Sequence, residues 1–284
     1  MLGKLIKYDM KYMARVLPWL YLGAFAMSLL ISLLFVLSAQ SSYDALLVTL
    51  ALVMLPFALM IGALSVCGTV FMMIRIYKNM FSDEGYLTFT LPVKTHKIVW
   101  SKLITGAIWN AFGGIVTIAV IALPIIATIA TIAKLEPDVA ASLSAYGEIF
   151  DAMYGTIAGE SGFVIGLISF ILNIIVALFS SNALFMLSCC LAQMLNKSRG
   201  IASVGIYLGM NFLLSTITSA SSRITMSLPA EPAVDAYIPE MQYYYNVLSS
   251  ASTTSLASVL ITAAATALAI FFSCRIVKNK LNMI

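Results

Sequence analysis

Six long apolar segments dominate the hydrophobic pattern of the chain, with polar stretches between them. Apart from Arg275 near the end of the last segment, none of the six contains an Asp, Glu, Lys or Arg. A helix that crosses a bilayer needs about 20 mostly apolar residues. The pattern therefore predicts an all-α integral membrane protein with six transmembrane helices, at residues 17–37, 45–74, 103–133, 163–193, 200–219 and 255–277.

Some of these segments are longer than a single crossing requires. At about 1.5 Å per residue, a helix of roughly 30 residues measures about 45 Å, whereas the hydrocarbon core is about 30 Å thick. We expect such helices to tilt, to kink or to project beyond the bilayer. The residues that favour a kink are Pro56 in the second segment and Gly113, Gly114 and Pro124 in the third.

Residues 1–16 follow a different pattern, in which apolar residues recur at helical spacing. Lys4, Lys7, Lys11 and Arg15 lie between the apolar positions. This arrangement predicts an amphipathic helix that lies in the membrane surface before the first span. A simple charged anchor is the alternative interpretation.

The composition agrees with a membrane protein and excludes several other classes. Apolar residues make up 61% and charged residues 10% of the 284 residues, whereas soluble domains contain about 25% charged residues. We expect one transmembrane domain over residues 1–284 and no folded soluble domain. The net charge of +4 does not indicate nucleic-acid binding, because the basic residues cluster at the ends of the apolar segments.

The distribution of basic residues predicts the orientation of the chain. If six spans are assumed, 14 of the 16 Lys and Arg residues fall on one side: Lys4, Lys7, Lys11, Arg15, Arg75, Lys78, Lys94, Lys97, Lys102, Lys197, Arg199, Arg275, Lys278 and Lys280. The basic excess marks the cytoplasmic side. Both termini are therefore predicted to be cytoplasmic, and the long connections 134–162 and 220–254 are predicted to face outward.

The sequence offers little for catalysis or metal binding. It contains no G-x-x-x-x-G-K-[ST] for ATP and no H-E-x-x-H for zinc. The four cysteines lie inside apolar segments, and the single histidine, His96, cannot form a metal site alone. We therefore expect no enzymatic activity in this chain, and no metal or cofactor bound by it.

Four asparagines lie inside the apolar segments, at Asn110, Asn173, Asn182 and Asn211, and the first three are candidates for a functional role. Their structural role would be to form hydrogen bonds between helices, which contribute about 0.6 kcal/mol each on average. Their functional role would be to line a polar path for a transported substrate. The segments contain no carboxylate at mid-span, although carriers driven by ion gradients usually depend on such groups.

Residues 75–102 form the longest strongly polar stretch, on the predicted cytoplasmic side. Ser82 and the two acidic residues after it are typical of a helix start, because carboxylates favour the first turn. Apolar and Thr residues alternate over 87–91 and would also fit a strand, but an isolated strand leaves its backbone groups unpaired. We expect a short helix that ends at Pro92 and whose exposed apolar side chains contact a partner or lipid headgroups.

This stretch resembles the cytoplasmic loop of ABC-2 type transporter permeases. In that family an acidic-x-Gly-x-Leu stretch leads to a Pro-Val step and to a basic residue before the third span. The residues that match here are Asp83, Glu84, Gly85, Leu87, Leu91, Pro92, Val93 and Lys102. Residues 88–90 stand where the commoner version has a second acidic residue. The six spans, the inside termini and the surface helix extend the resemblance to the whole chain.

The resemblance implies the membrane-spanning permease subunit of an ATP-binding-cassette exporter in a bacterial cell membrane. Such a permease pairs with a separate ATPase subunit, which binds ATP and Mg, and with a second permease subunit in a homodimer or heterodimer. The implied coupling helix, seated in a groove of the ATPase, contains Asp83, Glu84, Gly85, Tyr86, Leu87, Leu91 and Pro92. The short connection with Lys197 and Arg199 is implied as a second, smaller contact.

Two other function classes stay open at the level of the sequence. An autonomous secondary carrier or channel would use the buried Asn and Ser residues for its path. A non-transporting membrane sensor or scaffold would pair with an ATPase without moving a solute.

Overall fold

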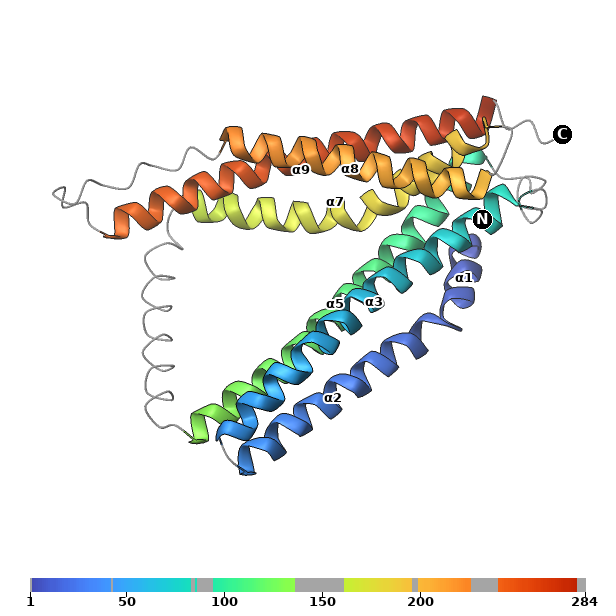
Figure 1. Cartoon of the computed structure of the whole chain (residues 1–284). Helices are drawn as coiled ribbons and strands as arrows, with labels where there is room; N and C mark the ends of the chain where they lie inside the picture. The colour runs from blue at the N-terminus through green and yellow to red at the C-terminus, as the bar shows by residue number, and fades with distance from the viewer. Residues whose placement is uncertain are drawn as a thin grey trace. The chain divides into compact units, whose positions relative to one another are not determined.

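The computed structural model of the protein describes residues 2–41, 43–82, 85, 94–135, 161–195, 199–225 and 240–279. Every element within these ranges is an α-helix, and Figure 1 shows their arrangement. The helices are α1 (Leu2–Met13), α2 (Leu17–Ser41), α3 (Tyr43–Phe81), α5 (Thr95–Leu135), α7 (Ser161–Ala192), α8 (Arg199–Thr225) and α9 (Glu240–Asn279).

Six of these helices contain a stretch long and apolar enough to cross a membrane. The candidate spans are Leu17–Leu37, Leu52–Phe81, Thr95–Ala133, Leu167–Ala192, Arg199–Arg223 and Leu256–Lys278. The prediction of an all-helical chain with six long apolar helices is confirmed in the described residues. The chain is thus a multi-pass membrane protein by the length and composition of its helices.

The helices extend well beyond the apolar segments that predict them. Helices α3, α5 and α9 contain 39, 41 and 40 residues, or about 60 Å each. Helix α3 continues past residue 74 to Phe81, and α5 begins at Thr95, before the apolar segment that starts at residue 103. Helix α9 begins at Glu240, so residues 240–254 belong to a helix and not to the expected connection.

The chain divides into two compact units, and each contains parts of α3 and α5. Unit 1 comprises Met1–Ile74 and Ala107–Asp151, and unit 2 comprises Arg75–Gly106 and Ala152–Ile284. Helices α1 and α2 therefore belong to unit 1, whereas α7, α8 and α9 belong to unit 2.

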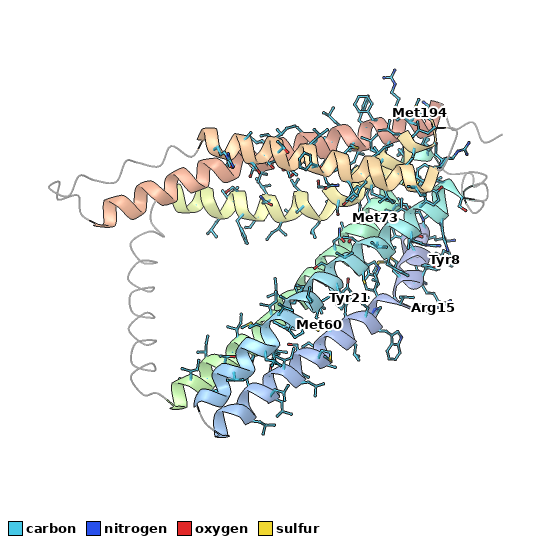
Figure 2. The ribbon with its side chains drawn as sticks, in the orientation of Figure 1. Tyr8, Arg15, Tyr21, Met60, Met73 and Met194 are labelled. Atoms are coloured by element: carbon cyan, nitrogen blue, oxygen red, sulfur yellow. The ribbon has the colours of Figure 1, made fainter. Side chains whose placement is uncertain are left out.

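Unit 1 has its own core between α2, α3 and α5. Tyr21 of α2 lies within it, and its ring packs edge-on against Phe112 of α5 at 5.6 Å between centroids. Met60 of α3 packs against the same cluster, and Figure 2 labels both Tyr21 and Met60. A Cβ on Gly113 would lie 2.6 Å from the Tyr21 hydroxyl oxygen, so this close approach requires a glycine.

The predicted N-terminal amphipathic helix is confirmed as a helix, α1. Its basic residues are exposed, and Tyr8 is 71% exposed (Figure 2), whereas Met13 is buried. Asp9 is also buried, which the sequence pattern does not predict; it lies one turn before Met13 and so on the same face. Tyr12 stacks on Phe71 of α3 at 6.3 Å between ring centroids. The position of α1 in the membrane surface stays a prediction.

Neither proline interrupts its helix. Pro56 lies inside α3 and Pro124 inside α5. Proline has no backbone N–H, so Pro124 leaves the carbonyl of Val120, four residues earlier, without its helical donor. The Ser28 hydroxyl of α2 donates to that carbonyl oxygen at 2.7 Å. Ser28 and Val120 are fully buried. The bond therefore gives the Val120 carbonyl the hydrogen-bond partner that surrounding hydrocarbon could not supply.

We expect the contribution of this hydrogen bond to depend on Pro124. Ser28→Ala should lower the free energy of unfolding by about 1 kcal/mol, because it leaves a buried carbonyl without a partner. In a Pro124→Ala background, where residue 124 again has an N–H for Val120, the loss should be smaller. Unfolding of the four proteins of this double-mutant cycle in detergent micelles or bicelles measures the coupling.

Ser32→Ala is the matched control, because the Ser32 hydroxyl donates only to the Ser28 carbonyl within its own helix, at 2.8 Å. It should change the unfolding free energy less than Ser28→Ala. Equal losses from Ser28→Ala with and without the Pro124→Ala substitution would contradict the assigned role.

Candidate functional site

The candidate site is the end of unit 2 that carries the polar stretch 75–102, where the sequence predicts contact with a partner. The helical extensions of α3 and α5 at this end are packed into unit 2. Their buried side chains are Ile76, Met80, Phe81, Ile98 and Val99, with exposed fractions of 2, 0, 7, 1 and 0%. The polar stretch between the two helices is therefore attached at both ends to helices with buried anchoring residues.

Most residues of the predicted coupling helix lie outside the described part of the chain: Asp83, Glu84, Tyr86, Leu87, Leu91 and Pro92. Gly85 is described, and it is helical and buried. Its N–H donates to the Ser82 carbonyl oxygen at 2.7 Å. This bond continues the chain from the end of α3 into a further turn, and the rest of the coupling helix stays a prediction.

Helix α5 begins at Thr95. The Lys97 N–H donates to the Lys94 carbonyl oxygen at 2.9 Å in its first turn. Lys94, His96 and Lys97 are exposed or partly exposed, whereas Lys102 is only 6% exposed. Exposed Lys94 thus lies just before α5 and exposed Lys97 in its first turn, whereas the buried Lys102 lies next to the apolar segment.

The second predicted contact lies at the start of α8. Lys197 is outside the described residues, and Arg199 is exposed. The Arg199 guanidinium donates to the Gln193 side-chain oxygen at 3.4 Å. A Cβ on the neighbouring Gly200 would lie 3.7 Å from the Tyr77 hydroxyl oxygen. The start of α8 therefore lies against the extension of α3, and the structure brings these two parts of the predicted contact region together.

The same end of unit 2 gathers basic residues from two helices. The C-terminal ends of α7 and α9 and the N-terminal end of α8 lie together there, as Figure 1 shows. Arg275 and Lys278 of α9 are exposed and line an open hollow of about 340 Å³ with Phe271 and Cys274. Such a basic surface can contact acidic groups of a partner or of lipid headgroups.

Asn182 lies inside unit 2, in close contact with α5. It is 4% exposed, and its amide nitrogen donates to the Leu178 carbonyl oxygen at 3.4 Å. A Cβ on Gly106 would lie 2.6 Å from the Asn182 Cγ and 2.9 Å from its Oδ1. The absence of a side chain at Gly106 therefore makes room for this amide between α5 and α7.

The other two asparagines do not join Asn182. Asn173 is exposed, and it precedes Asn182 by nine residues on α7, or about 900° of helical rotation, which puts the two on opposite sides of that helix. Asn110 is partly buried and lies in unit 1. The structure thus brings Asn182 to Gly106 and does not bring Asn173 to Asn182.

Sequence reasoning missed a buried polar strip on α5. The Ser101 hydroxyl donates to the Ile98 carbonyl oxygen at 2.7 Å, and the Thr105 hydroxyl donates to the Ser101 carbonyl oxygen at 2.8 Å. These two residues are 0 and 2% exposed. Their only signal in the sequence is the spacing of four residues, which places them on one face.

The three cysteines of unit 2 differ in exposure. Cys189 and Cys190 of α7 are fully buried, whereas Cys274 of α9 is partly exposed. Among the described residues, no group of three or more His, Cys, Asp and Glu side chains could hold a metal ion.

We expect the Gly106–Asn182 contact to control how closely α5 and α7 pack. Gly106→Val should lower the free energy of unfolding by about 1–3 kcal/mol, because the added methyl groups would overlap the Asn182 amide. Asn182→Ala should recover part of that loss in the double mutant, because it removes the overlapping atoms. Thermal unfolding of the purified variants in detergent measures both effects.

Gly205→Val provides the control, because a Cβ at Gly205 would meet no atom within 4 Å. It should change stability much less than Gly106→Val. A Gly106→Val protein as stable as the Gly205→Val protein would contradict the close packing.

Comparisons with known proteins do not assign this chain to a family. No family model matches it, and neither a curated protein nor a solved structure does. The resemblance to ABC-2 type permeases therefore depends on the residues of the 83–102 stretch and on the order of the helices.

Proposed function

We propose that this chain is the membrane-spanning permease subunit of an ATP-binding-cassette exporter. A separate ATPase subunit would bind and hydrolyse ATP with Mg, and a second permease subunit, identical or different, would complete the transporter. The complex would lie in a bacterial cell membrane. Residues 83–92 would contact the ATPase as a coupling helix, with Lys197 and Arg199 as a smaller contact.

The observation that supports this proposal best is the packing of the two helix extensions. A partner that moves residues 83–92 can shift the spans only if the segment is rigidly connected to them, because coupling is carried by packed side chains and rigid elements. Helices α3 and α5 continue without a break from the loop into candidate spans. Their loop-side ends are buried at Met80 and Val99, both 0% exposed.

The absence of a P-loop motif in the sequence agrees with an external source of energy. A carrier driven by an ion gradient would instead need ionisable or polar groups in a path. Asn182, the most buried of the three candidate asparagines, is engaged between α5 and α7. The close contact of the Asn182 amide with Gly106 favours a role in helix packing over a role in an ion path.

The proposed topology predicts which positions are accessible from the cytoplasm. In a variant that lacks the four native cysteines, Lys94→Cys and Lys278→Cys should react with a membrane-impermeant maleimide only after the cells are permeabilised. Lys134→Cys should react in intact cells, because residue 134 is predicted to face outward. Reaction of Lys94→Cys in intact cells would refute a cytoplasmic coupling helix.

The proposed coupling predicts a defect confined to the ATPase contact. We expect a P-loop protein to be encoded beside this chain, and co-purification with that protein and stimulation of its ATP hydrolysis in proteoliposomes measure the pairing. Glu84→Lys should weaken the pairing about tenfold or more, because reversal of an interfacial charge costs roughly 1.4 kcal/mol or more. Insertion into the membrane should stay unchanged.

Glu136→Lys is the matched control, because it makes the same charge reversal on the side predicted to face outward. It should leave ATPase pairing unchanged. Equal pairing by the Glu84→Lys and Glu136→Lys proteins would contradict the assigned contact. Solute movement driven by an ion gradient with the purified chain alone would favour the carrier.

A further inference from the structure

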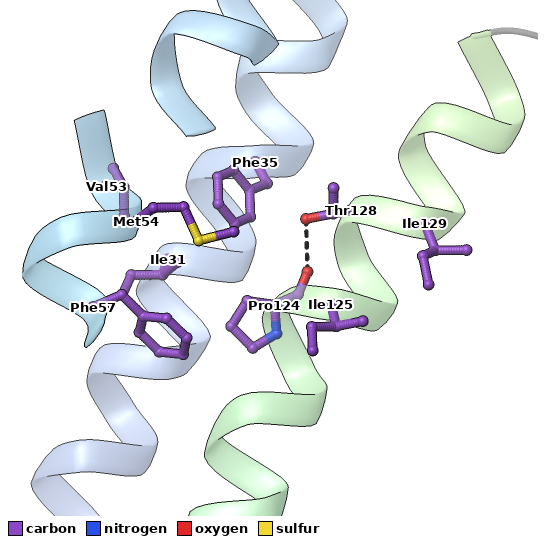
Figure 3. A pocket seen from close by; sticks show the side chains of 9 residues that line it. All are labelled: Ile31, Phe35, Val53, Met54, Phe57, Pro124, Ile125, Thr128 and Ile129. Carbon is purple, nitrogen blue, oxygen red and sulfur yellow. Dashed lines mark hydrogen bonds between the residues drawn. The ribbon is translucent and has the colours of Figure 1, made fainter. Parts of the chain in front are cut away.

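A cavity in unit 1 is lined by residues of three helices. Figure 3 shows it from close by, with Phe35 of α2, Phe57 of α3 and Pro124 of α5 around the space. Its volume is about 140 Å³. The full lining is Ile31, Phe35, Val53, Met54, Phe57, Pro124, Ile125, Thr128 and Ile129.

The cavity has a buried floor and an exposed rim. Ile31, Phe35 and Phe57 are 7, 2 and 9% exposed, and they form the floor. Met54 and Ile125 are each 48% exposed, so they form a rim where the cavity opens to the side of the helices. A ligand can therefore enter from the surroundings of α3 and α5.

The cavity offers no polar group to a ligand. Thr128 is the one lining residue with a polar side chain, and its hydroxyl already donates to the Pro124 carbonyl oxygen at 2.7 Å, the dashed line in Figure 3. Pro124 leaves the Val120 carbonyl without a helical donor, but that carbonyl oxygen accepts a hydrogen bond from the Ser28 hydroxyl. Water needs two to four polar partners to occupy a buried space, so an apolar group is the favoured occupant.

The position of the cavity along the helices indicates where that apolar group comes from. Phe35 lies near the end of the Leu17–Leu37 span, Val53 near the start of the Leu52–Phe81 span, and Ile129 near the end of the Thr95–Ala133 span. All three positions are at the predicted outer end of their spans. At about 1.5 Å per residue these three are within about 6 Å of that end, and the other lining residues are within about 14 Å of it. This range is the half of the hydrocarbon core that the outer leaflet occupies.

The volume limits the shape of the ligand. An apolar cavity of about 150 Å³ in another protein accommodates a group the size of benzene. A cavity of about 140 Å³ thus fits a short length of a linear hydrocarbon chain, whereas a fused ring system is too bulky.

We propose that this cavity is a binding site for the acyl chain of a membrane lipid, which enters between Met54 and Ile125 from the outer leaflet. The site differs from ordinary lipid contact because it holds part of one chain against the buried side chains of Phe35 and Phe57. It does not depend on the proposed transport function, and it can exist in a carrier, a scaffold or an exporter.

Photo-labelling tests the site directly. The purified full-length chain is reconstituted in phosphatidylcholine vesicles that contain a phosphatidylcholine with a diazirine in the upper part of its acyl chain. After illumination, adducts are located by mass spectrometry of peptides. We expect adducts on 53–57 and 124–129 in excess over those at Ile118, which is 69% exposed on α5. Labelling that follows exposure alone would overturn the proposal.

A matched pair of variants separates the cavity from the helix surface. Ile118 and Ile125 are seven residues apart, so they lie within about 20° of each other around α5. Ile125→Trp should abolish the excess labelling of 53–57, because the larger side chain closes the rim, whereas Ile118→Trp should not. Unchanged labelling in Ile125→Trp would overturn the site.

If Ile125→Trp does not fold, Met54→Trp closes the rim from α3, with Leu55→Trp as its control because Leu55 is 69% exposed. An unlabelled linear fatty acid should reduce the excess labelling, and a sterol should not. Equal competition by the sterol would overturn the assignment to linear chains. A second copy of the chain is the competing occupant. If the unmodified protein shows no excess labelling and the rim variants change its oligomeric state, the second copy covers the cavity and the lipid site is overturned.

Discussion

The constraint on which this structure depends is that hydrocarbon offers no hydrogen-bond partner to the backbone. Helices satisfy this constraint along most of each span, and every described element is a helix. Pro124 is one position where a span cannot satisfy it alone, and Ser28 of the neighbouring helix supplies the missing donor to Val120. One proline thereby fixes a contact between α2 and α5, and the apolar cavity lies directly beside it.

The same constraint is weaker beyond the apolar segments 45–74 and 103–133, where α3 and α5 nevertheless continue as helices. Tertiary packing explains their persistence, because isolated helical ends fray without it. Ile76, Met80, Ile98 and Val99 are buried in unit 2, so these ends are stabilised by contacts as well as by backbone bonds. This packing of the two helix ends is what the proposed coupling to a partner depends on.

The candidate contact surface could be predicted from the sequence only in part. Its location between the second and third apolar segments follows from the polar stretch 75–102 and from the basic residues beside it. The approach of Gly200 to Tyr77 could not be predicted, because it depends on how α8 packs on α3. For the same reason the sequence treats Asn173 and Asn182 alike, although one is exposed and the other is buried against Gly106.

The sequence by itself determined the helical class and the number of long apolar helices, because the apolar residues are continuous over lengths that match a membrane. It also determined that α1 is amphipathic, since that property depends only on local spacing. The tertiary structure alone decided how far α3, α5 and α9 extend, where Asp9 is buried and which side chains enclose the cavity at Pro124. Those features arise from contacts between residues far apart in the chain, which hydrophobic periodicity does not record.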